Sequence, residues 1–161
     1  MISQANRTES QWGHLLPIAL IAGVMLTAPC SASDASAIEL KAKHELKVSG
    51  DVAGMIHVQP DHHPVVGEIA QIWIALSQRG GKPIPLSGCD CRMTLRNLSS
   101  ATPVLNPILL PISLEGYTDV PSATLRFTQS GRYQVQLTGK PQRGYSFTPF
   151  TLEFEVNVAG S

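Results

Sequence analysis

Hydrophobic and polar side chains alternate with a period of two over most of the chain after residue 51. The clearest run lies near the C-terminus, where one face carries Phe150, Leu152, Phe154, Val156 and Val158. The other face carries Thr151, Glu153, Glu155 and Asn157. Residues 52–58, 122–128 and 133–137 alternate in the same way. Because successive side chains of a strand point to opposite sides of a sheet, this period predicts strands with one buried face and one wet face.

Two segments depart from this alternation. Residues 68–78 are apolar on both faces around Trp73, which predicts either a central strand covered on both sides or a strand at an interface. Residues 98–121 place Pro103, Pro107, Pro111 and Pro121 among leucines and isoleucines. Each proline lacks an N–H for a sheet ladder, so we expect this segment to hold only short edge pairings.

Glycine and proline punctuate the alternating segments at residues 60–64, 79–83, 130–131 and 139–141. Glycine supplies positive φ and proline fixes φ near about −65°, so these compositions predict turns. No long helix fits between them. Short strands of even spacing between such turns predict an all-β fold, an immunoglobulin-like antiparallel β-sandwich with Greek-key connections. The Cys-Trp-Cys spacing of antibody domains is missing.

The first 37 residues are typical of an export signal rather than of the folded domain. Residues 15–28 form an apolar stretch of 14 residues, whereas a membrane-spanning helix needs about 20. Small residues at 30–32 and 35–37 match a signal-peptidase site, and cleavage at either place removes Cys30. A lipoprotein processed at Cys30 is the alternative.

The sequence therefore predicts a signal peptide and cleavage region at 1–37, a tail or short strand at 38–50, and a single β-sandwich domain at 51–161. The mature chain would lie in the periplasm or another extracytoplasmic space and would have no stable membrane span.

The charge balance excludes one class of partner. The chain has 161 residues, with 12 Lys and Arg against 12 Asp and Glu. A formal net charge of zero argues against an electrostatic nucleic-acid binder, which presents a basic surface. Charged residues make up 15% and apolar residues 43% of the chain, which is too apolar for a disordered polymer and ordinary for a compact domain.

Three short motifs between about residues 62 and 156 resemble a known group. They are Pro64-Val65-Val66-Gly67, Gly80-Gly81-Lys82-Pro83-Ile84 and Gly131-Arg132-Tyr133, each at the start of an expected strand. In these motifs the chain resembles the YtkA-like and FixH-like exported immunoglobulin-like domains, and residues 80–91 also resemble exported proteins of cyanobacteria. The resemblance implies a sandwich fold and an extracytoplasmic location, and it implies no particular activity.

Cys89, Cys91 and Met93 form one candidate site. On an extended strand these alternate positions share a face, so they could offer three soft sulfurs to Cu(I). Leu95 continues the same face, which favours a core role instead, because free cysteine and methionine are commonly buried. A Cys89–Cys91 disulfide closing a very small, redox-labile ring is the third alternative. The spacing leaves all three open.

A second candidate site is rich in histidine. Met55 and His57 share the outward face of one expected strand, and His62 and His63 follow in a proline-bounded turn. One thioether and up to three imidazoles suit a copper or zinc ion. The alternative is that the adjacent histidines are simply solvated.

No catalytic motif accompanies these candidates. The sequence has no Gly-x-Ser-x-Gly elbow, no His-Glu-x-x-His, no phosphate-binding glycine loop and no dinucleotide fingerprint. We therefore expect a non-enzymatic exported module that binds an envelope protein, with residues 104–114 and the Trp73 strand as contact surfaces. The alternative is a soft-metal carrier that binds copper through the cysteine or the histidine set.

Overall fold

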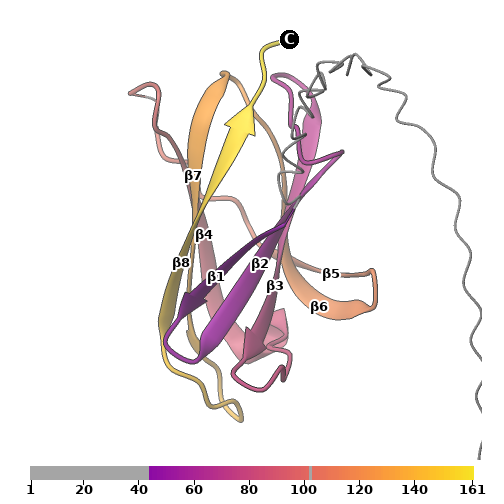
Figure 1. Cartoon of the computed structure of the whole chain (residues 1–161), viewed down its shortest axis with the longest axis vertical. Helices are drawn as coiled ribbons and strands as arrows, with labels where there is room; N and C mark the ends of the chain where they lie inside the picture. Colours follow the sequence, from indigo (N-terminus) through magenta and orange to yellow (C-terminus); the bar gives the residue numbers. More distant parts are fainter. Residues whose placement is uncertain (1–43, 102) are drawn as a thin grey trace, which may run out of the picture. The chain divides into compact units, whose positions relative to one another are not determined.

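The computed structural model describes residues 44–101 and 103–161, which form eight antiparallel strands in two layers (Figure 1). In chain order the elements are β1 (Glu45–Ser49), β2 (Val52–Gln59), β3 (Ile69–Gln78), the 3₁₀ turn η1 (Leu86–Gly88), β4 (Cys89–Asn97), β5 (Leu110–Leu114), β6 (Tyr117–Arg126), β7 (Gly131–Pro141) and β8 (Phe150–Val158). One sheet has the order β1-β2-β3-β6-β5 and the other β4-β7-β8. The expected all-β sandwich is confirmed, whereas the predicted signal peptide lies outside the described residues.

The core lies between the two sheets and is built from the alternating positions. In β8, Phe150, Leu152, Phe154, Val156 and Val158 are all buried, while the four residues between them are exposed. Val52, Ile56 and Val58 of β2 face the same core. Gly54 lies among them because a Cβ at this position would come 2.5 Å from a methyl group of Leu152. The absence of a side chain at Gly54 thus lets β2 approach β8 closely.

The prediction of a turn at residues 139–141 is wrong. These residues continue β7, and they pair in register with Cys89, Asp90 and Cys91 of β4. Gly139 serves packing here, since an added Cβ would lie 2.5 Å from the Phe150 ring and 2.6 Å from the Cys89 sulfur. Pro141 is the last residue of the strand, where a missing N–H does not interrupt the ladder.

The proline-rich segment is more ordered than predicted. Leu105 forms an isolated bridge with Leu95, and β5 is a short edge strand as expected. However, Pro121 lies inside the ten-residue strand β6. It comes one residue past the last pair between β3 and β6, and it faces Pro111 of β5. A proline opposite a proline leaves no ladder donor unpaired, which explains why β6 tolerates it.

The strand around Trp73 is covered on both faces, as the sequence predicted. The inward side chains of β3 join the main core, whereas Trp73 and Ala75 form a second cluster with Val120 on the outer face of the five-stranded sheet. Ile112 and Leu114 of β5 pack against this cluster. The β5–β6 hairpin and the stacked His57 ring together bury Trp73 completely. The expectation that the Trp73 strand forms a contact surface is therefore wrong, because this sheet face is already covered by the chain itself.

Candidate metal centre

Three histidines from separate parts of the chain converge on the outer face of the five-stranded sheet. His44, His57 and His62 each offer one ring nitrogen, and these nitrogens all lie within 4.8 Å of one another. Imidazole nitrogen is a ligand for copper, zinc, iron and nickel. The cluster is therefore a candidate site for a transition-metal ion.

The β1–β2 hairpin places His44 beside His57. Gly50 and Asp51 form a two-residue turn, so that Ser49 pairs with Val52 and Glu45 pairs with Ile56. One more step along this register brings His44 opposite His57. Directly opposed residues of an antiparallel pair project to the same face, with Cβ atoms about 4.5–5.5 Å apart. The two imidazole rings accordingly lie 4.2 Å apart between centroids.

The turn that follows β2 supplies His62. Its backbone N–H donates to the carbonyl of Val58 at 2.9 Å, and its Nδ1 accepts a long hydrogen bond, 3.5 Å, from the backbone N–H of Val58. His62 has a positive φ of 59°, a conformation that turns the chain back over the strand. These contacts hold the His62 ring above the end of β2, 6.0 Å from the His57 ring.

His57 is the buried member of the cluster. It is 5% exposed, and its ring stacks on Trp73 with centroids 3.6 Å apart and planes 11° apart. Its Nε2 is buried and has no hydrogen-bond partner within the described part of the chain. Burial, followed by the nearby His44 and His62, lowers the pKa of His57 from 6.5 to about 4. The neutral imidazole, which is the form that binds a metal ion, therefore predominates at neutral pH.

The cluster fits a small ion after a modest adjustment. Metal–nitrogen bonds of about 2.0–2.1 Å hold the nitrogens of a tetrahedral site about 3.4 Å apart. The observed upper limit of 4.8 Å exceeds this separation. The most widely separated rings are those of His57 and His62, with centroids 6.0 Å apart. Closing the site around an ion would therefore require a small movement of the half-buried His62 ring as well as of the exposed His44 ring.

The structure divides the predicted histidine set. His57 and His62 belong to the cluster, whereas the neighbouring His63 is exposed and is not a member of it. Met55 lies two residues before His57 on the same face of β2 and is half-buried. Met55 therefore lies on the sheet face that carries the cluster, opposite Leu46 of β1.

Cys89 and Cys91 form a disulfide in the structure, one of the alternatives that their spacing left open. Cys89 and Met93 are each 2% exposed and belong to the main core, and the half-buried Cys91 packs against it. Disulfide sulfurs are not thiolates, so metal binding by Cys89, Cys91 and Met93 would first require reduction.

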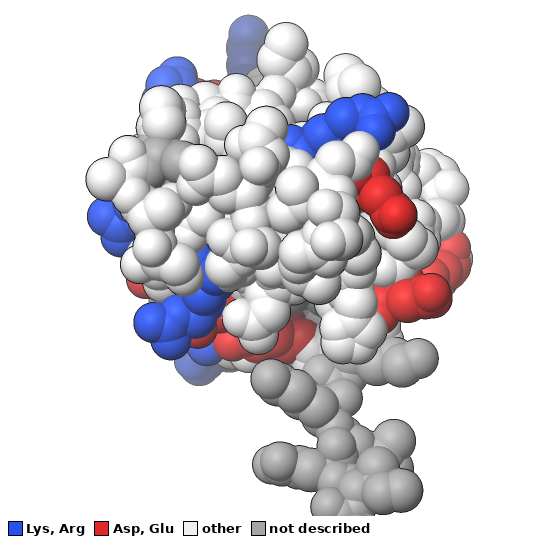
Figure 2. All heavy atoms as spheres, turned by 90° about the horizontal axis from the view of Figure 1, so that it is seen from above, with Lys and Arg blue, Asp and Glu red and all other residues white. Residues whose placement is uncertain are grey.

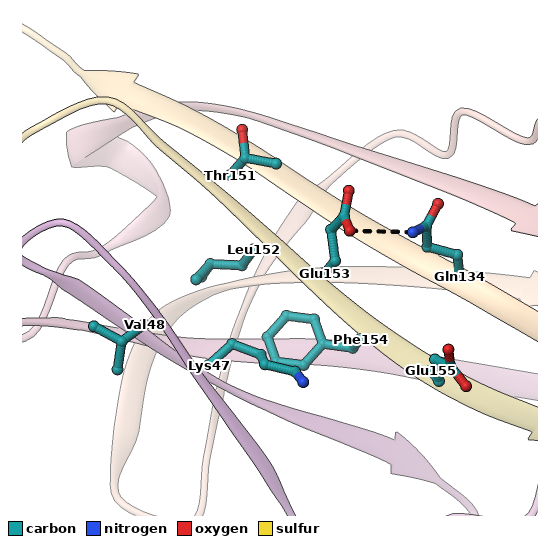
Figure 3. A pocket seen from close by; sticks show the side chains of 8 residues that line it. All are labelled: Lys47, Val48, Gln134, Thr151, Leu152, Glu153, Phe154 and Glu155. Carbon is teal, nitrogen blue, oxygen red and sulfur yellow. Dashed lines mark hydrogen bonds between the residues drawn. The ribbon is translucent and has the colours of Figure 1, made fainter.

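A groove between β1 and β8 shows how β1 is held in place. Its volume is about 390 Å³, and Figure 3 shows Lys47 and Val48 of β1 on one side and residues 151–155 of β8 on the other. Glu45 accepts a hydrogen bond from the backbone N–H of Glu155, and the Ser49 hydroxyl accepts one from that of Thr151. Side chains of β1 thereby accept hydrogen bonds from backbone N–H groups at the edge of β8. These bonds hold β1, the strand that follows His44, in place.

The surface carries charges of both signs. On the face seen from above, cationic and anionic side chains lie around a broad uncharged area (Figure 2). No strongly basic patch stands out on this face, in keeping with the formal net charge of zero. Among the described residues, no helix has the length and apolarity that crossing a membrane would require.

His44 is a cluster member that the sequence pattern did not predict, because residues 38–50 were expected to be a tail or a short strand. The signal was available in the turn, since a two-residue Gly50-Asp51 connection fixes the register of the hairpin. Counting back from that turn places His44 opposite His57. Trp73 was recognised as doubly buried, but its stacking on His57 depends on the β2–β3 register, which pairs the two residues directly.

No protein-family model and no curated protein sequence matches the chain. Several solved structures match the chain, and three of them are described below. FetP of uropathogenic Escherichia coli strain F11, as isolated after expression in the periplasm, has a TM-score of 0.55 at 14% identity, over 71% of this chain and 93% of FetP. A copper-bound variant of the same FetP has a TM-score of 0.54 at 13% identity, over 71% and 94%.

The third structure is a DUF4426-family protein of Pseudomonas aeruginosa PAO1, with a TM-score of 0.49 at 17% identity, over 71% of this chain and 95% of that protein. At 14% and 13% identity, the two FetP structures support the β-sandwich fold of this chain. They do not show what its histidine cluster binds.

Proposed function

We propose that this protein is an exported, non-enzymatic copper carrier. It binds one copper ion through the imidazoles of His44, His57 and His62. The observation that supports this most strongly is the convergence of three imidazole nitrogens within 4.8 Å of one another. Export is part of the proposal, on the strength of the leader at residues 1–37 and the resemblance to YtkA-like and FixH-like domains.

The unsatisfied nitrogen of His57 supports a ligand rather than a purely structural cluster. A buried polar atom without a partner costs about 1–3 kcal/mol, and Nε2 of His57 is such an atom among the described residues. A bound ion would use this lone pair.

Copper is the ion that the donor set favours. Among divalent first-row ions, Cu²⁺ binds nitrogen ligands most tightly. The thioether of Met55, on the same sheet face, would add a soft ligand suited to Cu(I). The copper-bound FetP variant, which shares the fold, is in keeping with this choice.

Copper(II) titration of the intact protein tests the proposal. We expect one ion per chain, measured by equilibrium dialysis with elemental analysis in a buffer that does not chelate copper. His57→Phe, which keeps an aromatic ring against Trp73, should abolish binding. His63→Ala is the matched control and should bind like the wild type, because His63 lies outside the cluster. A wild-type protein that binds no copper, or a His57→Phe variant that binds as well as the wild type, would contradict the proposal.

A second function, docking to an envelope protein, is favoured by the apolar edge near β5. Ile108 is 83% exposed and Leu110 is 62% exposed, next to Val104 and Leu105 at 48% and 40%. Exposed apolar side chains gathered in one segment are typical of interaction surfaces. A double variant, Ile108→Asp with Leu110→Asp, should lose a specific partner in cross-linking from the envelope fraction while keeping wild-type thermal stability. Unchanged cross-linking would count against this second function.

A further inference from the structure

The three histidines differ sharply in their exposure to solvent. His57 is buried against Trp73, His62 is half-buried, and His44 is exposed. An ion held by all three would thus have a closed side toward the sheet and an open side toward His44.

The three ligands also differ in how firmly the fold holds them. His57 lies inside β2 and pairs with Trp73 of β3, and its neighbour Ile56 pairs with Glu45 of β1. His62 is tied to Val58 of the same strand by two hydrogen bonds. His44 lies one residue before the first paired residue of β1, Glu45. His57 and His62 are therefore fixed relative to β2. His44 lies just beyond the end of the β1–β2 pairing and is held less firmly.

The three rings lie at the corners of a triangle. The centroid of His44 is 4.2 Å from that of His57 and 5.1 Å from that of His62, whereas those two are 6.0 Å apart. His44 is the exposed corner of this triangle, whereas His57 is buried and His62 is half-buried. An incoming ligand would therefore meet the site first at His44.

From this arrangement, and on the basis of the proposed function, we infer that copper is transferred by ligand exchange at His44. His57 and His62 hold the ion, and an imidazole, thioether or carboxylate of the acceptor replaces the His44 nitrogen. One copper–nitrogen bond breaks and one copper–acceptor bond forms, with no change in oxidation state. The ion never leaves as the free aqua species, so the carrier would hand copper directly to an acceptor protein with such ligands.

The dependence of the transfer rate on acceptor concentration tests this mechanism. The intact protein is loaded with one equivalent of copper(II) and mixed by stopped flow with increasing nitrilotriacetate, a carboxylate chelator. Direct exchange predicts a rate that rises linearly with chelator and does not level off. Transfer through spontaneous release predicts a plateau at the dissociation rate, and that result would overturn the inference.

Variants separate the roles of the ligands. His44→Ala should still bind copper, more weakly by about tenfold or more, and should transfer it faster than the wild type because one position is already open. His57→Phe should bind no copper, and His63→Ala should bind and transfer like the wild type. If His44→Ala abolished binding as completely as His57→Phe, or slowed transfer, His44 would be an equal ligand and the inference would fail.

These outcomes are distinct from a failure of the proposed function itself. A wild-type protein that binds no copper refutes the metal site. One that binds copper but releases it at a rate independent of chelator keeps the metal site and refutes only the exchange at His44.

Discussion

Replacement of His57 by phenylalanine should make the protein less sensitive to mild acid. The pKa of His57 falls from 6.5 to about 4 in the folded state, chiefly because the ring is buried and secondarily because His44 and His62 are close. Phenylalanine keeps a flat ring that can stack on Trp73. It removes both the titrating group and the unpartnered Nε2.

The sign and size of the effect follow from proton linkage. Because the folded pKa of His57 is depressed, the unfolded chain takes up its proton first as the pH falls. This contribution to stability is complete above pH 6.5 and is lost progressively down to about pH 4. At about 1.4 kcal/mol for each pKa unit, the wild type should lose about 2 kcal/mol between pH 7 and pH 5 through this one residue.

Urea unfolding at pH 7 and pH 5, in the presence of a chelator, measures this difference. His57→Phe should lose about 2 kcal/mol less stability over this interval than the wild type, and His63→Ala should resemble the wild type. Acidic groups titrate equally in all three proteins, so they cancel in the comparison. Equal losses in the wild type and in His57→Phe would show that the buried imidazole does not resist protonation and would refute the reasoning.

Four further predictions follow from the structure. Trp73 is the one tryptophan of residues 38–161, so copper should quench the tryptophan fluorescence of the exported chain, because the His57 and Trp73 rings stack at 3.6 Å. The quenching should disappear in His57→Phe. Gly139→Ala should destabilise the protein by about 1–3 kcal/mol in urea unfolding, because its Cβ would lie 2.5 Å from the Phe150 ring. Gly160→Ala is the control and should leave stability unchanged, because no atom lies within 4 Å of a Cβ at that position. Replacement of Cys89 and Cys91 together by alanine should lower stability by about 1–2 kcal/mol, the loop-entropy estimate for so short a loop. The copper stoichiometry should stay at one. A loss of copper binding would instead place the ion at the cysteines. Copper at about one hundred times its Kd should raise the stability of the wild type by about 2.7 kcal/mol, a gain that a chelator should reverse and that His57→Phe should not show in thermal unfolding.

Much of the fold could be predicted from the sequence, because burial imposes a period of two on each strand. The alternation in residues 150–158 and the doubly apolar run around Trp73 both correspond to strands of the predicted kind. The errors occurred where glycine and proline serve packing or pairing rather than turns. Gly139 leaves room for the Phe150 ring, and Pro121 faces another proline. Such reasons depend on a neighbour from another strand, which local composition does not reveal.

The candidate site was predicted only in part. The outward direction of His57 followed from its place in the alternation, and the nearness of His62 followed from its place in the next turn. His44 required the register of the β1–β2 hairpin. The exclusion of His63 depended on the direction of the turn after β2. His62 and His63 are neighbours in the chain, but only His62 belongs to the cluster. The state of Cys89 and Cys91 was likewise open until the two sulfurs were placed.

The sequence by itself determined that the chain forms strands, which side of each strand is buried, and that no single-sign charge dominates the surface. These properties depend on residues close together in the chain and on overall composition. Only the tertiary structure decided which imidazoles meet and which one is sealed against Trp73. The reason is physical: a metal site depends on the distances between side chains of different strands, and those distances are fixed by register and packing rather than by spacing along the chain.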